Sequence, residues 1–160
     1  MNDKDNHLPF FGVGPFLIFP IIIATAIAIM LSYYNMIPAF KSNGSIMALI
    51  GFVLIVLGII FWLLEVLNSK IDNNIKSNKL VTTGIYGFVR HPIYAAFLYA
   101  VTGLTFISNN LYLLILPVIY WLILTVVMIK TEEKWLYDKF GESYAEYSRK
   151  VSRFVPFLRI

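Results

Sequence analysis

The chain has 160 residues, of which 59% are apolar and 14% charged, and its formal net charge is +4. A soluble domain typically contains about 45–50% apolar and roughly 25% charged residues, so a core of this size cannot bury the excess, and a bilayer is the simplest solvent that accepts it. The absence of cysteine excludes disulfides, thiolate metal sites and cysteine nucleophiles, and with only His7 and His91 as imidazoles we expect no metal.

Two uncharged runs in the N-terminal half are each long enough to cross a bilayer. Residues 10–34 and residues 42–64 contain no charged side chain. A helix needs about 20 residues to cross the hydrocarbon core. The first run follows no basic segment and is too long for a signal peptide, so we expect it to be retained. The sequence therefore predicts spans at residues 10–34 and 42–67.

A third apolar stretch, residues 92–129, is too long for a single span. The polar triplet Ser108-Asn109-Asn110 in its middle is typical of a tight turn. The stretch therefore predicts a helical hairpin of residues 92–107 and 111–129. The first arm is only about 24 Å long and should lie partly beneath neighbouring helices. The predicted fold is all-α: one membrane domain, residues 1–160, with about four transmembrane helices.

The basic residues are distributed unevenly over the connections. Eleven of the 13 Lys and Arg residues fall in the 68–91 loop or in the tail after residue 129. The positive-inside rule places both segments in the cytoplasm, and an even number of spans places the N-terminus there too. In the tail, Tyr144, Tyr147 and Val151 recur at helical spacing among basic residues. This pattern predicts a cytoplasmic amphipathic helix on the membrane surface, which would serve a site only indirectly, as a lid.

The segment before the hairpin combines aromatic, basic and helix-starting residues. Pro92 suits the first turn of a helix, with Arg90 and His91 just before it. The free N–H groups of such a helix start favour an anion such as a carboxylate. Tyr86, Phe88 and Tyr94 add aromatic surface. The alternative is an aromatic interfacial belt with an arginine for lipid headgroups.

Two adjacent acids follow the last apolar segment. Glu132 shares a helix face with apolar residues four and eight positions later, so it should point toward protein or membrane. An acid so placed needs a partner and is a functional hypothesis. The alternative is a structural ion pair with Arg90 or Lys130. For Glu133 the alternative is an exposed charge that caps the helix.

Other chemistries find little support. The chain has no Gly-rich phosphate loop and no dinucleotide fingerprint. No Ser-His-Asp set is indicated, because the one plausible histidine precedes a proline at a helix start. The basic residues flank spans, so membrane topology explains them better than nucleic-acid binding does.

An ordered motif runs through residues 79–156, the region that we expect to be catalytic. Its residues are Leu80, Val81, Gly84, Tyr86, Arg90, His91, Pro92 and Tyr94, then Glu132, Glu133, Leu136, Phe140, Gly141, Tyr144 and Tyr147, and finally Val151, Arg153, Phe154 and Pro156. The motif resembles the isoprenylcysteine carboxyl methyltransferase family, which belongs with the phospholipid methyltransferases.

The resemblance implies S-adenosylmethionine as methyl donor, and a lipophilic acceptor that enters from the bilayer among membrane lipids. It places Arg90 and Glu133 at the reacting centre. The positions that it assigns to donor binding are Asn78, Lys79, Leu80, Val81, Tyr86, His91, Pro92, Ile93, Tyr94 and Glu132.

Two positions depart from the family pattern. Met128 stands where the eukaryotic prenylcysteine enzymes place a substrate-binding arginine, and Ile71 stands where the family can place a glutamine. The resemblance thus covers the donor half of the site better than the acceptor half. Two other hypotheses stay open: a membrane reductase of related helical arrangement with a nicotinamide cofactor, and a non-catalytic membrane subunit.

Overall fold

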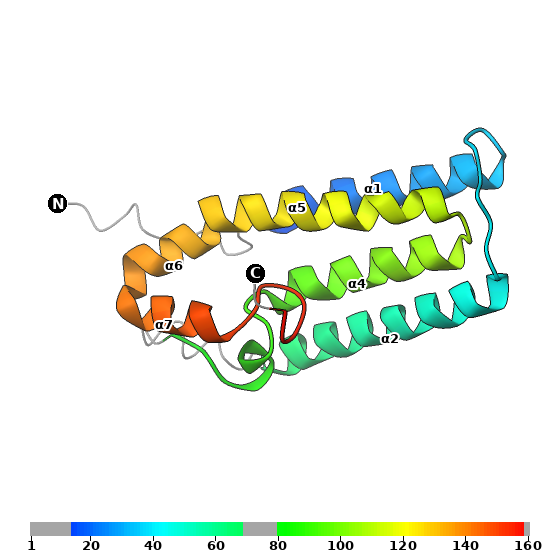
Figure 1. Ribbon diagram of the computed structural model, residues 1–160. Helices are drawn as coiled ribbons and strands as arrows, with labels where there is room; N and C mark the ends of the chain where they lie inside the picture. Colours follow the sequence, from blue (N-terminus) through cyan, green and yellow to red (C-terminus); the bar gives the residue numbers. More distant parts are fainter. Residues whose placement is uncertain (1–13, 69–79, 159–160) are drawn as a thin grey trace.

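The computed structural model describes residues 14–68 and 80–158, which form an antiparallel helical bundle (Figure 1). No strand occurs among these residues, and one isolated bridge joins Val89 to Ser152. The elements are α1 (Gly14–Tyr33), α2 (Gly44–Asn68), the 3-10 helix η2 (Gly84–Gly87), α4 (Pro92–Ile107), the 3-10 helix η3 (Leu111–Leu114), α5 (Ile115–Lys130), α6 (Glu132–Phe140) and α7 (Glu142–Lys150).

The helices confirm the predicted membrane architecture. Three stretches are long and apolar enough to cross a bilayer: Phe16–Tyr33, Gly44–Leu67 and Leu111–Phe140. The fourth apolar helix, α4, has 16 residues and lies between α2 on one side and α1 and α5 on the other (Figure 1). Half of its residues are buried, as expected for a short helix covered by its neighbours. The chain is an all-α, multi-pass membrane protein.

The last apolar stretch bends where it leaves the membrane. Leu111–Phe140 would extend about 45 Å as one straight helix, well beyond the roughly 30 Å of a hydrocarbon core. Thr131 breaks it with φ −119° and ψ −86°, and α6 turns away from α5 at that point (Figure 1). The spanning part is therefore residues 111–130, and α6 lies beyond it.

The predicted hairpin turn is anchored by one buried amide. Asn110 is 2% exposed, and its Nδ2 donates to Ser32 Oγ at 2.9 Å and to the Pro38 carbonyl at 3.1 Å. Its Oδ1 accepts from the backbone N–H groups of Phe40 and Tyr112, each at 3.2 Å. A buried amide is stable only when it is paired in this way, so Asn110 ties the hairpin to the α1–α2 connection.

Helices α2 and α4 pack with their backbones in contact. A Cβ on Gly51 would lie 2.5 Å from the carbonyl oxygen of Gly103, and a Cβ on Gly58 would lie 2.7 Å from that of Ala96. The two contacts are seven residues apart on each helix, which is about two helical turns. Small residues let helices approach closely in a membrane, where packing replaces the hydrophobic effect as the driving force.

Gly51→Ala is expected to lower the free energy of unfolding in detergent by about 1–3 kcal/mol, because the new methyl group meets rigid backbone. Gly44→Ala is the matched control on the same helix, since its Cβ would meet only the flexible Asn109 side chain at 3.4 Å. Equal stability of the two variants in chemical denaturation would show that the helices are not in backbone contact.

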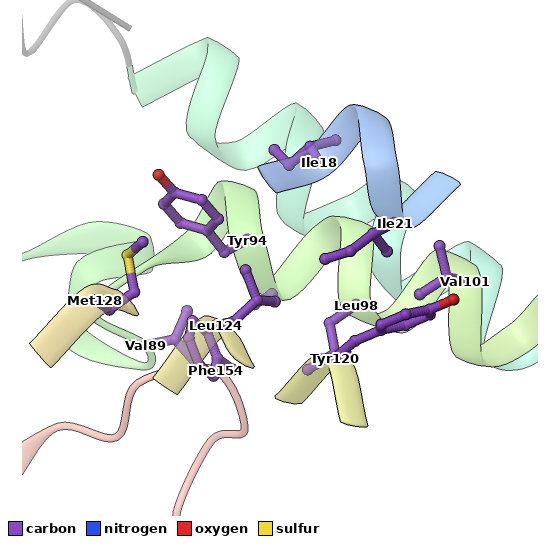
Figure 2. Close-up of a cluster of buried hydrophobic side chains, with 11 residues drawn as sticks. Ile18, Ile21, Val89, Tyr94, Leu98, Val101, Tyr120, Leu124, Met128 and Phe154 are labelled. Atoms are coloured by element: carbon purple, nitrogen blue, oxygen red, sulfur yellow. The ribbon is translucent and has the colours of Figure 1, made fainter. Parts of the chain in front are cut away.

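The buried core joins α1, α4 and α5 to the segments beyond the membrane (Figure 2). Val89, from the loop before α4, is fully buried, and Phe154, from the C-terminal tail, is 1% exposed. The backbone N–H of Arg90 donates to the Ser152 carbonyl at 2.8 Å, and that of His91 donates to the Arg153 carbonyl at 3.1 Å. The loop and the tail are thereby fixed side by side at the start of α4.

Candidate functional site

The residues singled out by the sequence gather where α4 begins and α5 ends. His91 is the N-cap of α4 and Pro92 its first residue, as predicted. Both are buried, as is Arg90. Glu132 and Glu133 open α6 at the same end of the bundle (Figure 1). The break at Thr131 thus brings the two carboxylates over the start of α4.

Glu133 is the centre of a buried charge cluster. Its Oε1 lies 3.2 Å from Arg90 Nη1 and 3.2 Å from His91 Nε2. Arg153 approaches the same carboxylate with its Nε 2.9 Å from Oε1 and its Nη2 3.2 Å from Oε2. The alternative that Glu133 is an exposed capping charge is wrong, because Glu133 is only 8% exposed.

These neighbours keep Glu133 ionised. Burial by itself raises the pKa of the Glu133 carboxyl, but the hydrogen bond from His91, the charge of Arg90 and the hydrogen bonds of Arg153 outweigh it and bring the pKa down to about 2. Glu133 is therefore a carboxylate across the physiological range. It can fix the orientation of its basic neighbours, but it is a weak proton acceptor.

His91 joins the two acids. Its Nε2 faces Glu133 and its Nδ1 lies 3.5 Å from Glu132 Oε2, while Glu132 Oε1 accepts a 2.6 Å hydrogen bond from Tyr94. Burial lowers the pKa of His91, but the hydrogen bonds and charges of the two acids raise it above its ordinary value. Arg90 was one of the two ion-pair partners considered for Glu132, and in the structure it pairs with Glu133.

A third acid, not singled out from the sequence, lies at the same end. Glu65 is in the last turns of α2, and its Oε1 accepts a 2.6 Å hydrogen bond from Tyr86. Its Oε2 is buried and has no hydrogen-bond partner among the described residues. Burial raises the pKa of Tyr86, and the charge of Glu65 raises it further. The available signal was a lone acid inside the 42–67 span, where an ionisable residue is a functional hypothesis by default.

Tyr86→Phe is expected to lower the free energy of unfolding by about 1–3 kcal/mol, because the partly buried Glu65 loses its donor. The double variant Tyr86→Phe/Glu65→Leu should recover most of this loss, since both polar partners are gone. Tyr137→Phe removes an exposed hydroxyl and is the control. Thermal unfolding measures these stabilities. A double variant no more stable than Tyr86→Phe would disprove the pairing of Tyr86 with Glu65.

The amphipathic tail helix forms as predicted, but it contacts the site directly. Tyr144 and Tyr147 of α7 are buried. Tyr144 accepts a 3.4 Å hydrogen bond from Arg90, and Tyr147 donates to the Tyr86 carbonyl at 2.7 Å. The expectation that this helix serves a site only indirectly is therefore wrong.

The other predicted donor-binding residues are less central. Leu80 and Val81 are half-buried in the loop before η2, and Ile93 is 41% exposed on the first turn of α4. Asn78 and Lys79 lie outside the described residues. Within residues 14–68 and 80–158, no group of three or more His, Asp or Glu side chains is arranged to hold a metal.

The fold and this cluster define a helical membrane protein with a polar site at one end of its bundle. A family model described as phospholipid methyltransferase matches residues 16–143. The chain therefore belongs to the phospholipid methyltransferase family, and the resemblance drawn from the sequence motif is confirmed.

Several relatives match about half of the chain. It is 36% identical to the protein-S-isoprenylcysteine O-methyltransferase of Schizosaccharomyces pombe over 52% of the chain and 35% of that protein. It is 33% identical to the cobalt-zinc-cadmium resistance protein CzcN of Cupriavidus metallidurans over 53% of the chain and 39% of that protein. It is 32% identical to methanethiol S-methyltransferase 1 of Bradyrhizobium diazoefficiens over 62% and 34%. The chain thus spans between 34% and 39% of the length of these relatives.

Proposed function

We propose that this chain transfers a methyl group from S-adenosylmethionine to a lipophilic acceptor in the membrane. The observation that carries the proposal is the arrangement of Glu132, His91 and Glu133 over the start of α4 in a chain of the phospholipid methyltransferase family. Two of its relatives are named as methyltransferases of a thiol and of an isoprenylcysteine.

The chemistry of the side chains fits this donor, which carries a sulfonium, an ammonium and a carboxylate. Tyr86 donates a hydrogen bond to Glu65, and burial together with the charges of Glu65 and Glu132 raises the pKa of Tyr86. Two acids and a tyrosine therefore share one region. Acidic and aromatic groups stabilise cations. The buried Oε2 of Glu65 still needs a hydrogen-bond donor, and an ammonium or hydroxyl group of the bound donor can supply it. The first turn of α4 offers N–H groups to a carboxylate.

When bound, S-adenosylmethionine supplies an electrophilic methyl group that leaves a neutral thioether behind. The residues of the chain then need only to align the acceptor with that methyl group, so positioning accounts for most of the rate. Arg90 and Glu133 hold His91 and Tyr144 in place around the reacting centre. Glu133 is a weak base here, because its basic neighbours outweigh burial and lower its pKa. Both ring nitrogens of His91 already face carboxylates, Nδ1 that of Glu132 and Nε2 that of Glu133. A carboxylate or thiolate acceptor, which needs no further deprotonation, suits the site better than an amine.

The acceptor side differs from that of the eukaryotic prenylcysteine enzymes. Met128, which replaces the expected arginine, is fully buried in the apolar core. Lys130 lies two residues on, about 200° around the helix, and cannot replace that arginine. We propose a small lipid acceptor rather than a prenylated protein C-terminus.

The proposed donor enters from the cytoplasm, so the start of α4 must face that side. With Glu146→Cys on the exposed face of α7, a membrane-impermeant thiol reagent should label the chain only after the cells are permeabilised. Lys41→Cys, in the connection at the opposite end of the bundle, should be labelled in intact cells. Both residues are exposed, and the chain has no native cysteine. The reverse labelling pattern would overturn the orientation.

Calorimetry on detergent-solubilised protein tests the proposed cofactor. We expect S-adenosylmethionine to bind and reduced nicotinamide dinucleotides not to bind. Binding of the dinucleotide alone would point to the membrane reductase, and binding of neither would point to a subunit without chemistry.

A further inference from the structure

A polar pocket lies beside the Glu133 cluster and is lined by residues of the loop before α4, the end of α5, α6, α7 and the C-terminal tail. It is open and has a volume of about 410 Å³. Its floor includes the buried Arg90, Glu133 and Tyr144, and its rim includes Lys134 and Arg149. His91, Tyr94 and Glu132, which we assign to the donor, do not line it.

The charge of this pocket is strongly positive. Four cationic side chains and one carboxylate line it: Arg90, Lys134, Arg149, Arg153 and Glu133. The carboxylate is already engaged by two of these arginines and by His91. Arg149 also pairs with Glu142 at 3.2 Å, but both of these side chains are more than two-thirds exposed, where such a pair is weak. The pocket therefore favours an anion.

The position of the pocket indicates where the anion comes from. Ile129, next to the last residue of α5, lines the pocket and is 45% exposed. Tyr137, also in the lining, is 54% exposed. An apolar side chain at the end of a span lies where hydrocarbon gives way to headgroups, and tyrosine is enriched at that level. The pocket thus opens beside the headgroup layer.

The Nε of Arg90 supplies an independent observation. The Arg90 side chain is 5% exposed, and its Nε has no hydrogen-bond partner among the described residues. A guanidinium has five donors that match the oxygens of a phosphate. Arg90 therefore both lines the cationic pocket and keeps one donor that no described residue uses.

We propose that this pocket binds the phosphate headgroup of an anionic membrane lipid, separately from the methyl donor. The lipid would hold α6 and α7 against the end of α5 and so stabilise the segment that carries Glu132 and Glu133. Arg90 and Glu133 border both this pocket and the reacting centre. The proposal nevertheless does not depend on the methyl transfer, because its ligand is not the methyl donor and its test alters Lys134 and Arg149, which are assigned neither to the donor nor to the reacting centre.

Native mass spectrometry of the purified chain tests the proposal, with phosphatidylglycerol titrated against phosphatidylcholine. The variant Lys134→Gln/Arg149→Gln removes two rim charges, each contributing roughly fivefold to affinity, and should bind phosphatidylglycerol roughly 30-fold more weakly. Lys139→Gln/Lys150→Gln removes two charges from the same helices outside the pocket and should bind like the parent chain. Thermal unfolding checks that both variants are folded.

The parent chain should also unfold at a higher temperature with phosphatidylglycerol than without it, and the rim variant should lose this shift. Equal binding of phosphatidylglycerol by the rim and control variants would overturn the proposal. Inorganic phosphate that binds as tightly as the lipid would overturn the assignment to a lipid and indicate a soluble anion instead.

Discussion

Glu133→Gln is expected to lower the free energy of unfolding in detergent by about 3–5 kcal/mol. Glu133 is the common partner of Arg90, Arg153 and His91 and is 8% exposed. The amide keeps the shape of the side chain but removes its charge, so the buried Arg90 loses its carboxylate partner. Breaking a buried ion pair from one side has a cost of this size.

Glu142→Gln is the matched control, because Glu142 also pairs with an arginine but is 68% exposed. Its loss should change stability by less than about 1 kcal/mol. Chemical denaturation followed by tryptophan fluorescence measures both. If the two variants were equally stable, the buried cluster would not exist as described.

Glu132→Gln is expected to weaken S-adenosylmethionine binding by about ten- to a hundredfold with little effect on folding. The loss corresponds to one charge-assisted hydrogen bond, about 1.5–3 kcal/mol. Folding should tolerate the change, because the amide oxygen can still accept the hydrogen bond of Tyr94 and the Glu132 side chain is 17% exposed.

Isothermal titration of the donor into the parent chain, Glu132→Gln and Glu142→Gln measures this effect. Glu142 is exposed on α7 and should leave the affinity unchanged. A dissociation constant for Glu132→Gln within twofold of the parent value would reduce Glu132 to a structural partner of His91 and Tyr94.

The membrane architecture could be predicted because the bilayer imposes it on each segment separately. A span needs a fixed length of apolar residues, and the polar turn at residues 108–110 marks the hairpin without reference to any partner. The same locality explains the correct prediction of α4, whose start depends on Pro92 and on the residues beside it.

The partners within the site could not be predicted in the same way, because they depend on how distant segments pack. Glu132 and Glu133 are adjacent, yet the break at Thr131 directs one toward Tyr94 and the other into the arginine cluster. Helical periodicity could not predict the buried partners of Glu133. Arg153 comes within hydrogen-bonding distance of Glu133 because the tail pairs with the loop before α4. Glu65 was missed because its meaning depends on Tyr86, which belongs to another segment.

Transfer of a labelled methyl group tests the central claim most directly. Membranes containing the chain are incubated with S-adenosylmethionine labelled in its methyl group, and the lipid and protein fractions are separated. We expect label in the lipid fraction. This label should be absent from membranes that lack the chain and reduced with Glu132→Gln. An added farnesylcysteine analogue should be labelled more slowly than the lipid. A chain that binds the donor but transfers no label to any fraction would contradict the account.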